Sequence, residues 1–279
     1  MRSLLILLTY VCLQTWLGTA QVVLDVAANA FDDQYIGCAN EMDKEAPALL
    51  EEEKSRHILL RKVWHKSRTK WASVKTKLSL PTAFKDEYGR AIVAYTDKYF
   101  YSDFNGAVKR AGTSQEDYMK CFQFKAFHYY LTRALQLLRG RCEVTYNTTV
   151  YRGTKSQHTG SGLIRFGYFA SSSMKRKKAE EFGTGTLFTI RTCFGVKIAA
   201  FSHFPEQEEV LIPVHEKFRV TPDGSNRFVL WSTNRTCSHF NCAYLGGKKN
   251  QQCLDNSECT SPSWDQTVKR SALFQSYNV

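Results

Sequence analysis

The chain has 279 residues, enough for one large domain or two small ones, and 13% of them are aromatic, so a sizeable core is possible and intrinsic disorder is not expected. The formal net charge is +12. A basic chain is a candidate for nucleic-acid binding, but its cationic clusters at residues 61–62, 175–178 and 248–249 are scattered, and no zinc-finger or single-strand-binding motif accompanies them. We therefore expect no nucleic-acid partner. The charge fits contact with acidic glycans or cell surfaces, or a merely solvated face.

The first 20 residues have the pattern of a secretory signal peptide. Arg2 precedes a mostly apolar stretch from Leu4 to Leu17, and the small residues at 18–20 are typical of a cleavage site before Gln21. A membrane anchor is the alternative, but the apolar run is short for a span. Residues 261–279 are polar and basic and lack the apolar tail that a lipid anchor needs. The sequence predicts a secreted, extracellular protein with no membrane anchor.

Cysteine usage agrees with secretion. One of the nine cysteines, Cys12, lies in the leader. The other eight are Cys38, Cys121, Cys142, Cys193, Cys237, Cys242, Cys253 and Cys259. An even number in a secreted chain indicates disulfides, and the wide spacings without a Cys-x-x-Cys pair argue against a zinc site, so we expect no metal. Asn147 and Asn234 each begin an Asn-x-Thr triplet and are expected glycosylation sites.

The N-terminal half has helical periodicity. Apolar residues recur at helical spacing over Glu45–Val74, with Pro47 expected in the first turn. Residues Arg90–Thr96 fit either a strand or a buried helical turn. Tyr118–Leu138 is the strongest helical pattern, and Gly140 follows it as a C-terminal glycine.

After Cys142 the pattern changes to short β-rich runs separated by glycines and a Pro-Asp-Gly turn. The expected strands are 150–151, 163–169, 186–194, 196–201, 209–214, 217–221 and 227–231. One helix, Met174–Phe182, interrupts them, with the preceding serines as N-caps. Helices first and strands afterwards indicate an α+β fold. No linker and no internal repeat is evident, and the chain from residue 247 is a polar basic tail.

Three strings carry most of the chemistry. They are Tyr151-Arg152-Gly153-Thr154, Phe169-Ala170-Ser171-Ser172-Ser173, and Gln207-Glu208-Glu209-Val210-Leu211-Ile212-Pro213. Each lies at the start, end or edge of an apolar run, so each presents an arginine, a hydroxyl or a carboxylate from a rigid strand. This set is suited to an anionic sugar-phosphate substrate, provided that the three strings meet in space.

Glu209 is the candidate catalytic carboxylate. Strand alternation would place Gln207 and Glu209 on one face and Glu208 on the other. An ordinary charged strand end is the alternative. The apolar run that follows favours the functional interpretation, because it attaches the carboxylate to a buried element.

Arg152 offers a planar fork to paired phosphate oxygens, and Gly153 would let a ligand approach the backbone closely. A surface salt bridge is the alternative for the arginine. The serines at the end of their strand are placed where anions and ribose hydroxyls bind readily. For Ser172 and Ser173 we prefer simple helix capping, which leaves Ser171 as the candidate site residue.

In this order and spacing the three strings resemble the arginine–serine–glutamate signature of the vertebrate ecto-ADP-ribosyltransferases. The strings at residues 31–35, 126–131 and 134–138 fit the same family, and the likeness covers about residues 22–245. Residues 237–247 look most like the secreted, type-5 members. The resemblance implies a helical N-terminal part followed by two facing, mainly antiparallel sheets that form an NAD cleft. The catalytic domain would span residues 21–246, between a signal peptide at 1–20 and a tail at 247–279.

The resemblance also implies roles for individual residues. NAD is the substrate, and no prosthetic group is expected. Arg152 would bind the diphosphate, Ser171 would hold the nicotinamide ribose, and Glu209 would accept a hydrogen bond from the ribose 2′-hydroxyl. Phe182 would stack near the nicotinamide. Further NAD contacts would come from Tyr95, Gly153 and Ser202.

The family's cysteine pattern implies the pairs Cys38–Cys242 and Cys142–Cys193, and leaves the other four cysteines unassigned. The implied activity is that of a monomeric NAD(P)-dependent protein-arginine ADP-ribosyltransferase, acting on an extracellular acceptor protein. A fixed carboxylate would stabilise the oxocarbenium cation that forms when the nicotinamide–ribose bond breaks.

Two residues depart from the family pattern. Arginine-modifying members usually carry glutamate where Gln207 stands, and a neutral amide orients a guanidinium less well, so NAD hydrolysis is favoured. Tyr168 stands where relatives often have glutamine beside the cleft. The rival hypothesis is a non-catalytic secreted basic protein that binds glycans or a receptor. The intact set of Arg152, Ser171 and Glu209 argues against it.

Overall fold

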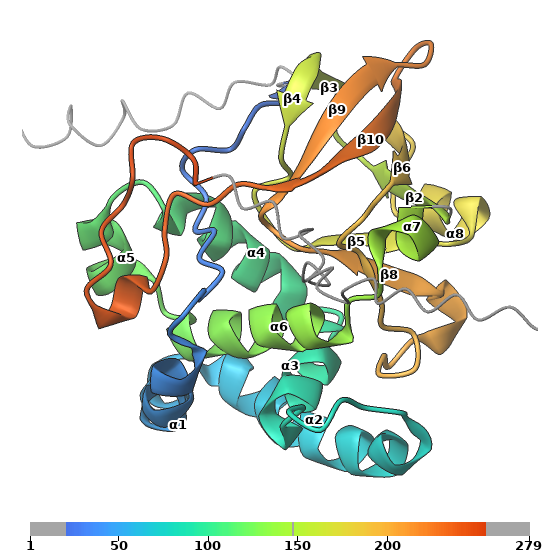
Figure 1. Cartoon of the computed structure of the whole chain (residues 1–279). Coiled ribbons are helices and arrows are strands. Elements are labelled where there is room, and N and C mark those ends of the chain that lie inside the picture. The colour runs from blue at the N-terminus through green and yellow to red at the C-terminus, as the bar shows by residue number, and fades with distance from the viewer. Residues whose placement is uncertain (1–20, 147, 255–279) are drawn as a thin grey trace, which may run out of the picture.

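The computed structural model describes residues 21–146 and 148–254, and within these a helical N-terminal part is followed by a mixed sheet (Figure 1). The expected α+β order is therefore confirmed. The expected signal peptide, Asn147, Cys259 and most of the expected tail lie outside the described residues. In the described part, no helix combines the length and the apolar character needed to cross a membrane.

The helical part consists of α1 (Ala39–Arg56), α2 (Ile58–Val74), the 3-10 turn η1 (Lys75–Lys77), α3 (Asp86–Tyr95), α4 (Phe100–Ala111), α5 (Gln115–Cys121), α6 (Lys125–Leu138) and the short α7 (Cys142–Tyr146). Their apolar faces share one large core with parts of the sheet, and this core contains Phe31, Trp71, Phe104, Phe127 and Leu211.

The helix expected over Glu45–Val74 is two helices. The helix is interrupted at His57, which has an extended backbone. Its Nδ1 accepts a hydrogen bond from the Leu60 N–H at 3.2 Å, so His57 caps α2. Pro47 lies inside α1 and not in its first turn, because α1 already begins at Ala39. The helix continues through the proline because residues on both sides of it, including Met42 and Leu50, are buried.

The pattern over Tyr118–Leu138 is also interrupted, at residues 122–124 between α5 and α6. Phe122 has an extended backbone and is buried in the core. The buried Glu53 carboxylate then caps α6, since it accepts hydrogen bonds from the N–H groups of Ala126 at 2.7 Å and Phe127 at 3.3 Å. Of the two readings left open for Arg90–Thr96, the structure has the helical one, in α3.

The strands are β1 (Val22–Val23), β2 (Thr149–Thr154), β3 (His158–Thr159), β4 (Gly162–Ile164), β5 (Ala170–Ser173), β6 (Thr186–Arg191), β7 (Val196–Lys197), β8 (Glu209–Ile212), β9 (Glu216–Pro222) and β10 (Arg227–Thr236). Helix α8 (Arg176–Glu181) and the 3-10 turns η2 (Pro205–Gln207) and η3 (Ala243–Leu245) complete the described part. The strand expected over 163–169 ends at Ile164, and the one over 196–201 ends at Lys197.

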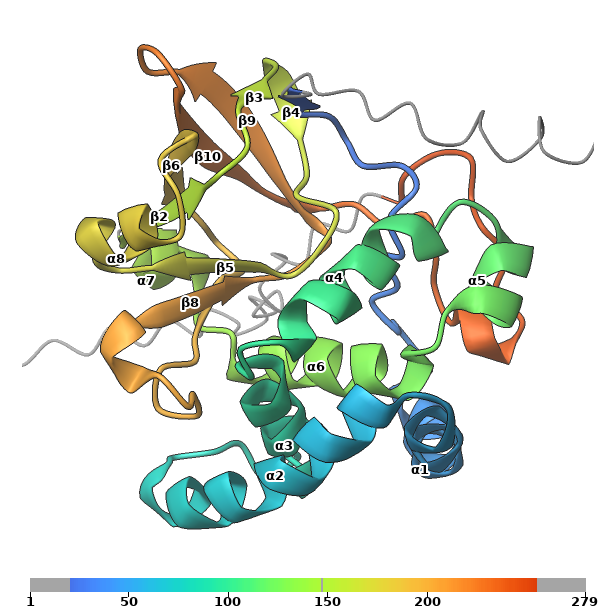
Figure 2. The same cartoon turned by 180° about the vertical axis from the view of Figure 1, so that it is seen from behind.

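Strand pairing gives one eight-stranded sheet in the order β4-β9-β10-β6-β2-β5-β8-β7, beside the small β1-β3 pair. In the large sheet β10 and β6 are parallel and the other pairs are antiparallel. Its two halves are joined by a single residue pair, Tyr151 with Ser173. They face each other across a second core, to which Phe188 and Leu230 come from one half and Val210 and Ile212 from the other. The two expected sheets are thus continuous at a narrow junction (Figure 2).

Both disulfides that the resemblance implied, Cys38–Cys242 and Cys142–Cys193, are present. A third, Cys237–Cys253, attaches residues beyond position 246 to the body, and Cys121 is exposed and has no disulfide partner among the described residues. The string at residues 31–35 strengthens the first of these connections. Asp33 accepts hydrogen bonds from the N–H groups of residues 242 and 243, at 3.0 and 2.8 Å, so the start and the end of the domain are held together.

Candidate active site

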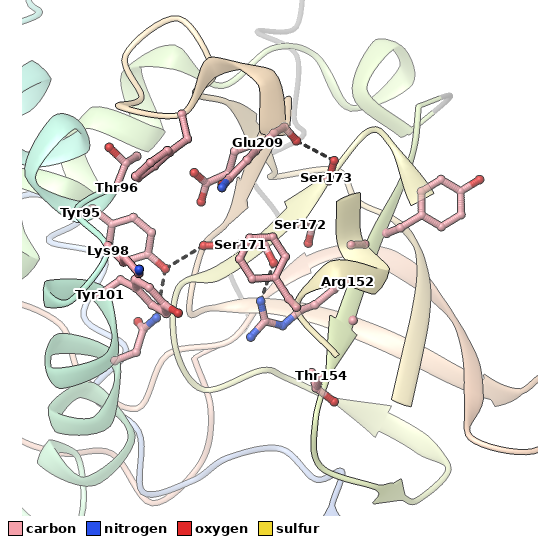
Figure 3. A pocket seen from close by; sticks show the side chains of 17 residues that line it. Tyr95, Thr96, Lys98, Tyr101, Arg152, Thr154, Ser171, Ser172, Ser173 and Glu209 are labelled. Carbon is pink, nitrogen blue, oxygen red and sulfur yellow. Dashed lines mark hydrogen bonds between the residues drawn. The ribbon is translucent and has the colours of Figure 1, made fainter. Parts of the chain in front are cut away.

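A cavity of about 550 Å³ opens between the helical part and strands β2, β5 and β8, and its size is typical of sites for small molecules (Figure 3). Its lining residues come from both halves of the chain. They are Tyr95, Thr96, Lys98, Tyr101, Asn105, Tyr151, Arg152, Gly153, Thr154, Ser171, Ser172, Ser173, Ala179, Phe182, Phe204, Gln207 and Glu209.

Arg152, Ser171 and Glu209 all line this one cavity. An Arg152 Nη atom donates a hydrogen bond to the Ser171 carbonyl oxygen, which connects β2 directly to β5. On the other side, the β5–β8 register pairs Ser173 with Glu209 and Ser171 with Leu211, so the side chains of Ser171 and Glu209 lie on the same face of the two strands. Antiparallel pairing of β5 with its two neighbours therefore brings the three strings together.

Glu209 is the first residue of β8, and only 7% of its surface is exposed. Burial raises the pKa of this carboxyl to about 7, against the smaller opposing effects of a hydrogen bond from Ser171 and the positive charge of Arg152. Near neutral pH the group is therefore close to half ionised. A buried carboxylate with a raised pKa in a cavity is typical of a catalytic group.

Tyr95 holds Ser171 in position. The Tyr95 hydroxyl donates to the Phe169 carbonyl at 2.7 Å and lies 3.2 Å from Ser171 Oγ, while Asn105 Nδ2 donates to Tyr95 Oη at 3.0 Å. A phenol has a single proton to donate, and that proton is used on Phe169. In the 3.2 Å contact the Ser171 hydroxyl is therefore the donor and Tyr95 Oη the acceptor, which fixes the position of the Ser171 side chain.

Arg152 has a second partner in Tyr168. The other Nη atom donates to Tyr168 Oη at 3.3 Å, and the guanidinium carbon lies 5.4 Å from the centre of the phenol ring. Lys109 Nζ lies 4.1 Å from the same ring centre. Burial alone would lower the pKa of Arg152, but Tyr168 raises it. Desolvation would raise the pKa of the partly buried Tyr168 phenol, but the charge of Arg152 lowers it. Arg152 Nε is buried and has no partner among the described protein atoms.

The expectation that Gln207 and Glu209 share one face of a strand rests on a wrong premise, because residues 207–209 do not form a continuous strand. Gln207 ends η2, and Glu208 adopts a left-handed backbone with φ 46° and ψ 49° before β8 begins. This turn is held because Ser173 Oγ donates to the Gln207 carbonyl at 2.6 Å. Gln207 and Glu209 nevertheless both line the cavity, whereas Glu208 pairs with Lys175 at 2.7 Å on the exposed side.

The expected capping role of the serines is also wrong. Helix α8 begins at Arg176, and its N-cap Lys175 makes no side-chain cap. Ser173 Oγ accepts a hydrogen bond from the Lys175 N–H at 3.0 Å, and thus stabilises the turn before the helix. Ser172 Oγ is buried without a partner among the described protein atoms, although Ser172 lines the cavity.

The space above Gly153 is filled by the chain itself. A Cβ at this position would lie 2.2 Å from the Ala179 carbonyl oxygen and 2.4 Å from that of Gly183. The glycine therefore permits the close approach of α8 to β2, and because Gly153 also lines the cavity, its expected contact with a ligand stays a prediction. Because Ala179 and the half-exposed Phe182 also line the cavity, this approach positions one of its walls.

Of the other expected NAD contacts, Tyr95 and Phe182 line the cavity and Ser202 does not. Ser202 is buried, and its hydroxyl accepts a hydrogen bond from the Phe204 N–H at 2.9 Å, so it acts on the cavity wall through its neighbour. The cavity also contains residues that sequence reasoning missed: Lys98, Tyr101, Asn105, Thr154 and Phe204. Tyr101 and Asn105 share a helix face at i and i+4, but that spacing does not distinguish a cavity wall from a core.

The chain matches the sequence profile described as NAD:arginine ADP-ribosyltransferase over residues 24–238, and it belongs to this family. It is 48% identical to ecto-ADP-ribosyltransferase 5 of Rattus norvegicus over 245 residues, which cover 84% of this chain and 80% of the relative. To ecto-ADP-ribosyltransferase 5 of Homo sapiens it is 46% identical over 269 residues, 91% of this chain and 92% of the relative.

Among solved structures, the eukaryotic mono-ADP-ribosyltransferase ART2.2 superposes with a TM-score of 0.73 at 44% identity, covering 80% of this chain and 99% of that one. A mutant of ART2.2 in complex with NAD gives a TM-score of 0.73 at 43% identity, with the same coverage of both chains. The resemblance seen in the three strings is thus confirmed at the level of family and fold.

Proposed function

We propose that the protein is a mono-ADP-ribosyltransferase that cleaves the nicotinamide–ribose bond of NAD and transfers ADP-ribose to protein arginine or to water. The observation that carries the proposal is the convergence of Arg152, Ser171 and a nearly buried Glu209 on one cavity. Membership of the family and the NAD complex of a mutant of the similar protein ART2.2 support it.

The cavity has the charges that NAD requires. Its cationic lining residues are Arg152 and Lys98, and Glu209 is its carboxylate. The diphosphate of NAD would bind at Arg152, which keeps N–H donors beyond the two that bond to Ser171 and Tyr168, among them the Nε–H that has no partner among the described protein atoms. The aromatic ring of Phe182 would then stack near the nicotinamide at the cavity edge. Fixing the diphosphate and the nicotinamide, on either side of the nicotinamide ribose, holds the scissile bond in a set geometry.

Glu209 would act on the charge that develops at the ribose. As the C–N bond breaks, its electron pair leaves with nicotinamide and the ribose becomes an oxocarbenium cation. An ionised Glu209 stabilises this cation from a site with little water, where such an interaction is strong. Ser171 keeps the carboxylate oriented and favours its charged form. An acceptor nitrogen or a water oxygen then forms the new bond to the ribose carbon and loses a proton.

Glutamine at position 207 should favour reaction with water more than a glutamate at this position would. Gln207 is neutral, so it neither attracts a guanidinium by charge nor removes a proton from it. Glu208 is not a substitute, because it points outward to Lys175. We therefore propose substantial NAD glycohydrolase activity beside arginine transfer. The partner would be an extracellular protein with an accessible arginine.

The remaining assignments belong to the same proposal. Residues 1–20 are a signal peptide, the protein is secreted as a monomer, and Asn147 and Asn234 carry glycans. The catalytic domain spans residues 21–246. The tail from residue 247 begins attached to that domain, because Cys253 is bonded to Cys237 and the backbones of Ser238 and Leu254 form a β-bridge.

Release of nicotinamide from NAD by the purified protein, with and without agmatine as an arginine analogue, tests the proposal. Glu209→Ala should abolish release, and the matched control Glu208→Ala should retain it, because Glu208 lies outside the cavity. Gln207→Glu should raise transfer to agmatine relative to hydrolysis. Full activity of Glu209→Ala would refute the site assignment, and an unchanged ratio in Gln207→Glu would refute the role of Gln207.

A further inference from the structure

Helix α2 carries positive charge without a compensating acidic residue. Its 17 residues include no aspartate or glutamate. We define its basic ridge as Arg61, Lys62, Lys66, Arg68 and Lys70. His65 lies among these residues, exposed like most of them.

The packing of α2 forces this charge outward. The buried residues Leu60, Val63, Trp64, Ser67 and Trp71 recur at helical spacing and face the core. The cations occupy the remaining positions, so they cover the outward half of a helix about 25 Å long. Figures 1 and 2 show α2 along the outer edge of the helical part, where no other helix or strand of the described residues covers its outward side.

The ridge is poorly neutralised by its neighbours. Lys66 pairs with Asp97 at 3.3 Å, and within the described residues the other four cations make no ion pair. The preceding helix differs in this respect. In α1, Lys54 pairs with Glu51 at 2.6 Å and Arg56 with Glu52 at 2.7 Å, so two of its three cations are paired within the helix. The positive potential of α2 is therefore a property of this element and not of the whole helical part.

The positive charge of the ridge lowers the pKa of two neighbouring residues. The pKa of Arg90, which stacks on Trp64, is lowered by burial and further by the charge of Arg68. The pKa of His203 is lowered by burial and further by Lys66 and Lys70, against the opposing charge of Asp97. His203 adjoins Phe204 of the cavity wall. The positive field of the ridge thus extends toward the side of the molecule where the cavity opens.

We propose that the basic ridge of α2 binds a linear sulfated polysaccharide. Sulfate groups along an extended chain match a row of arginines and lysines on one helix face, through charge-assisted hydrogen bonds. A membrane surface fits less well, because the outward residues near the end of α2 are Thr69, Ala72 and Ser73, and in this helix only Ile58, its first residue, exposes a large apolar side chain of the kind that inserts into lipid. Nucleic acid fits less well too, because both tryptophans of α2 are buried and the imidazole of His65 is the one exposed aromatic ring that this helix offers for base stacking.

This binding goes beyond the transferase reaction and does not use its machinery. No residue of the ridge lines the cavity. Together with the proposed secretion, it would retain the enzyme on sulfated glycans of the cell surface or matrix and concentrate it near its acceptor proteins.

Binding to immobilised heparin tests the inference with two variants that each lose three positive charges. One is Arg61→Gln/Lys62→Gln/Arg68→Gln, in which glutamine preserves helix propensity. The control is Lys155→Gln/Arg219→Gln/Arg227→Gln, which removes exposed cations of the sheet half. The ridge variant should bind about tenfold more weakly or worse and show a smaller dependence on salt, since fewer counterions are released. The control should stay close to wild type.

Equal losses in the two variants would overturn the inference, because net charge alone would then explain binding. The inference would also be overturned if a DNA duplex or phosphatidylserine vesicles bound to the ridge as tightly as heparin does. Binding of desulfated heparin with undiminished affinity would overturn it too. The variant Arg61→Lys/Arg68→Lys keeps the charge and should retain most of the affinity. Nicotinamide release, measured on the same preparations, should be unchanged in the ridge variant, so this proposal and the proposed activity can fail separately.

Discussion

Replacing Glu209 by glutamine should make the protein more stable at neutral and alkaline pH while removing its activity. Glutamine keeps the shape of the side chain and can still accept a hydrogen bond from Ser171, but it has no charge to desolvate. The pKa of Glu209 is raised from 4.5 to about 7 by burial. A difference of about 2.5 pKa units corresponds to about 3 kcal/mol at roughly 1.36 kcal/mol per unit.

The direction follows from proton binding. Between pH 4.5 and about 7 the folded protein holds a proton on Glu209 that the unfolded chain has lost, so the free energy of unfolding falls as pH rises through this range. Below pH 4.5 both states are protonated and the cost vanishes. Glu209→Gln should therefore match wild type near pH 4.5 and exceed it by about 3 kcal/mol at pH 8.

Urea unfolding at these two pH values, with disulfides intact and tryptophan fluorescence as the signal, measures the difference. Burial also raises the pKa of Glu53 to about 8 and that of Glu216 to about 7, but both residues titrate in wild type and variant alike and cancel. The control Glu208→Gln removes an exposed ion pair worth less than about 1 kcal/mol. A stability difference for Glu209→Gln that did not change with pH, or that favoured wild type at pH 8, would refute the reasoning.

Three further expectations concern the cavity. Because ionised Glu209 is needed, kcat/KM for nicotinamide release should rise with pH through about 7 in an activity profile, and a flat profile would contradict this. Tyr168→Phe removes a hydrogen bond that helps to hold Arg152, and a hydrogen bond of this kind contributes about 1 kcal/mol. Steady-state kinetics should therefore show a KM for NAD that is about fivefold higher, with kcat nearly unchanged. Gly153→Ala should lower both the yield of folded protein and its activity, since its Cβ would lie 2.2 Å from a backbone oxygen of α8; wild-type thermal stability would rule out that clash.

The three candidate site residues were predictable from sequence because each lies next to a short apolar run. Arg152 and Glu209 line the cavity from β2 and β8, near the strands expected at 150–151 and 209–214, whereas Ser171 lines it from β5, beyond the strand expected at 163–169. Their convergence was not predictable from periodicity. It depends on β5 pairing with both β2 and β8, and strand order is a non-local property that the resemblance to the family supplied.

The turn before Glu209 shows where local reasoning fails. Alternation treats residues 207–209 as extended, but Glu208 has a left-handed backbone, which costs free energy in a residue with a side chain. Tertiary contacts hold it there: Ser173 binds the Gln207 carbonyl, and the Met174 N–H donates to the Glu208 carbonyl at 3.2 Å. Neither contact can be predicted from the sequence of the turn itself. The break at Phe122 has the same character, because that residue is buried in the core and does not continue its helix.

The raised pKa of Glu209 and the charge of the substrate are physically connected. In the free protein, burial disfavours the carboxylate, and only Ser171 and Arg152 oppose this effect. The nicotinamide ring of NAD is cationic, so a dinucleotide bound in the proposed orientation brings a positive charge close to Glu209 and favours its ionised form. The substrate would then ionise the group that acts on it, and the pKa governing kcat should be lower than the one governing kcat/KM. As nicotinamide leaves, the positive charge moves onto the ribose, and the carboxylate stabilises it more strongly there than in the ground state. That difference in stabilisation lowers the barrier.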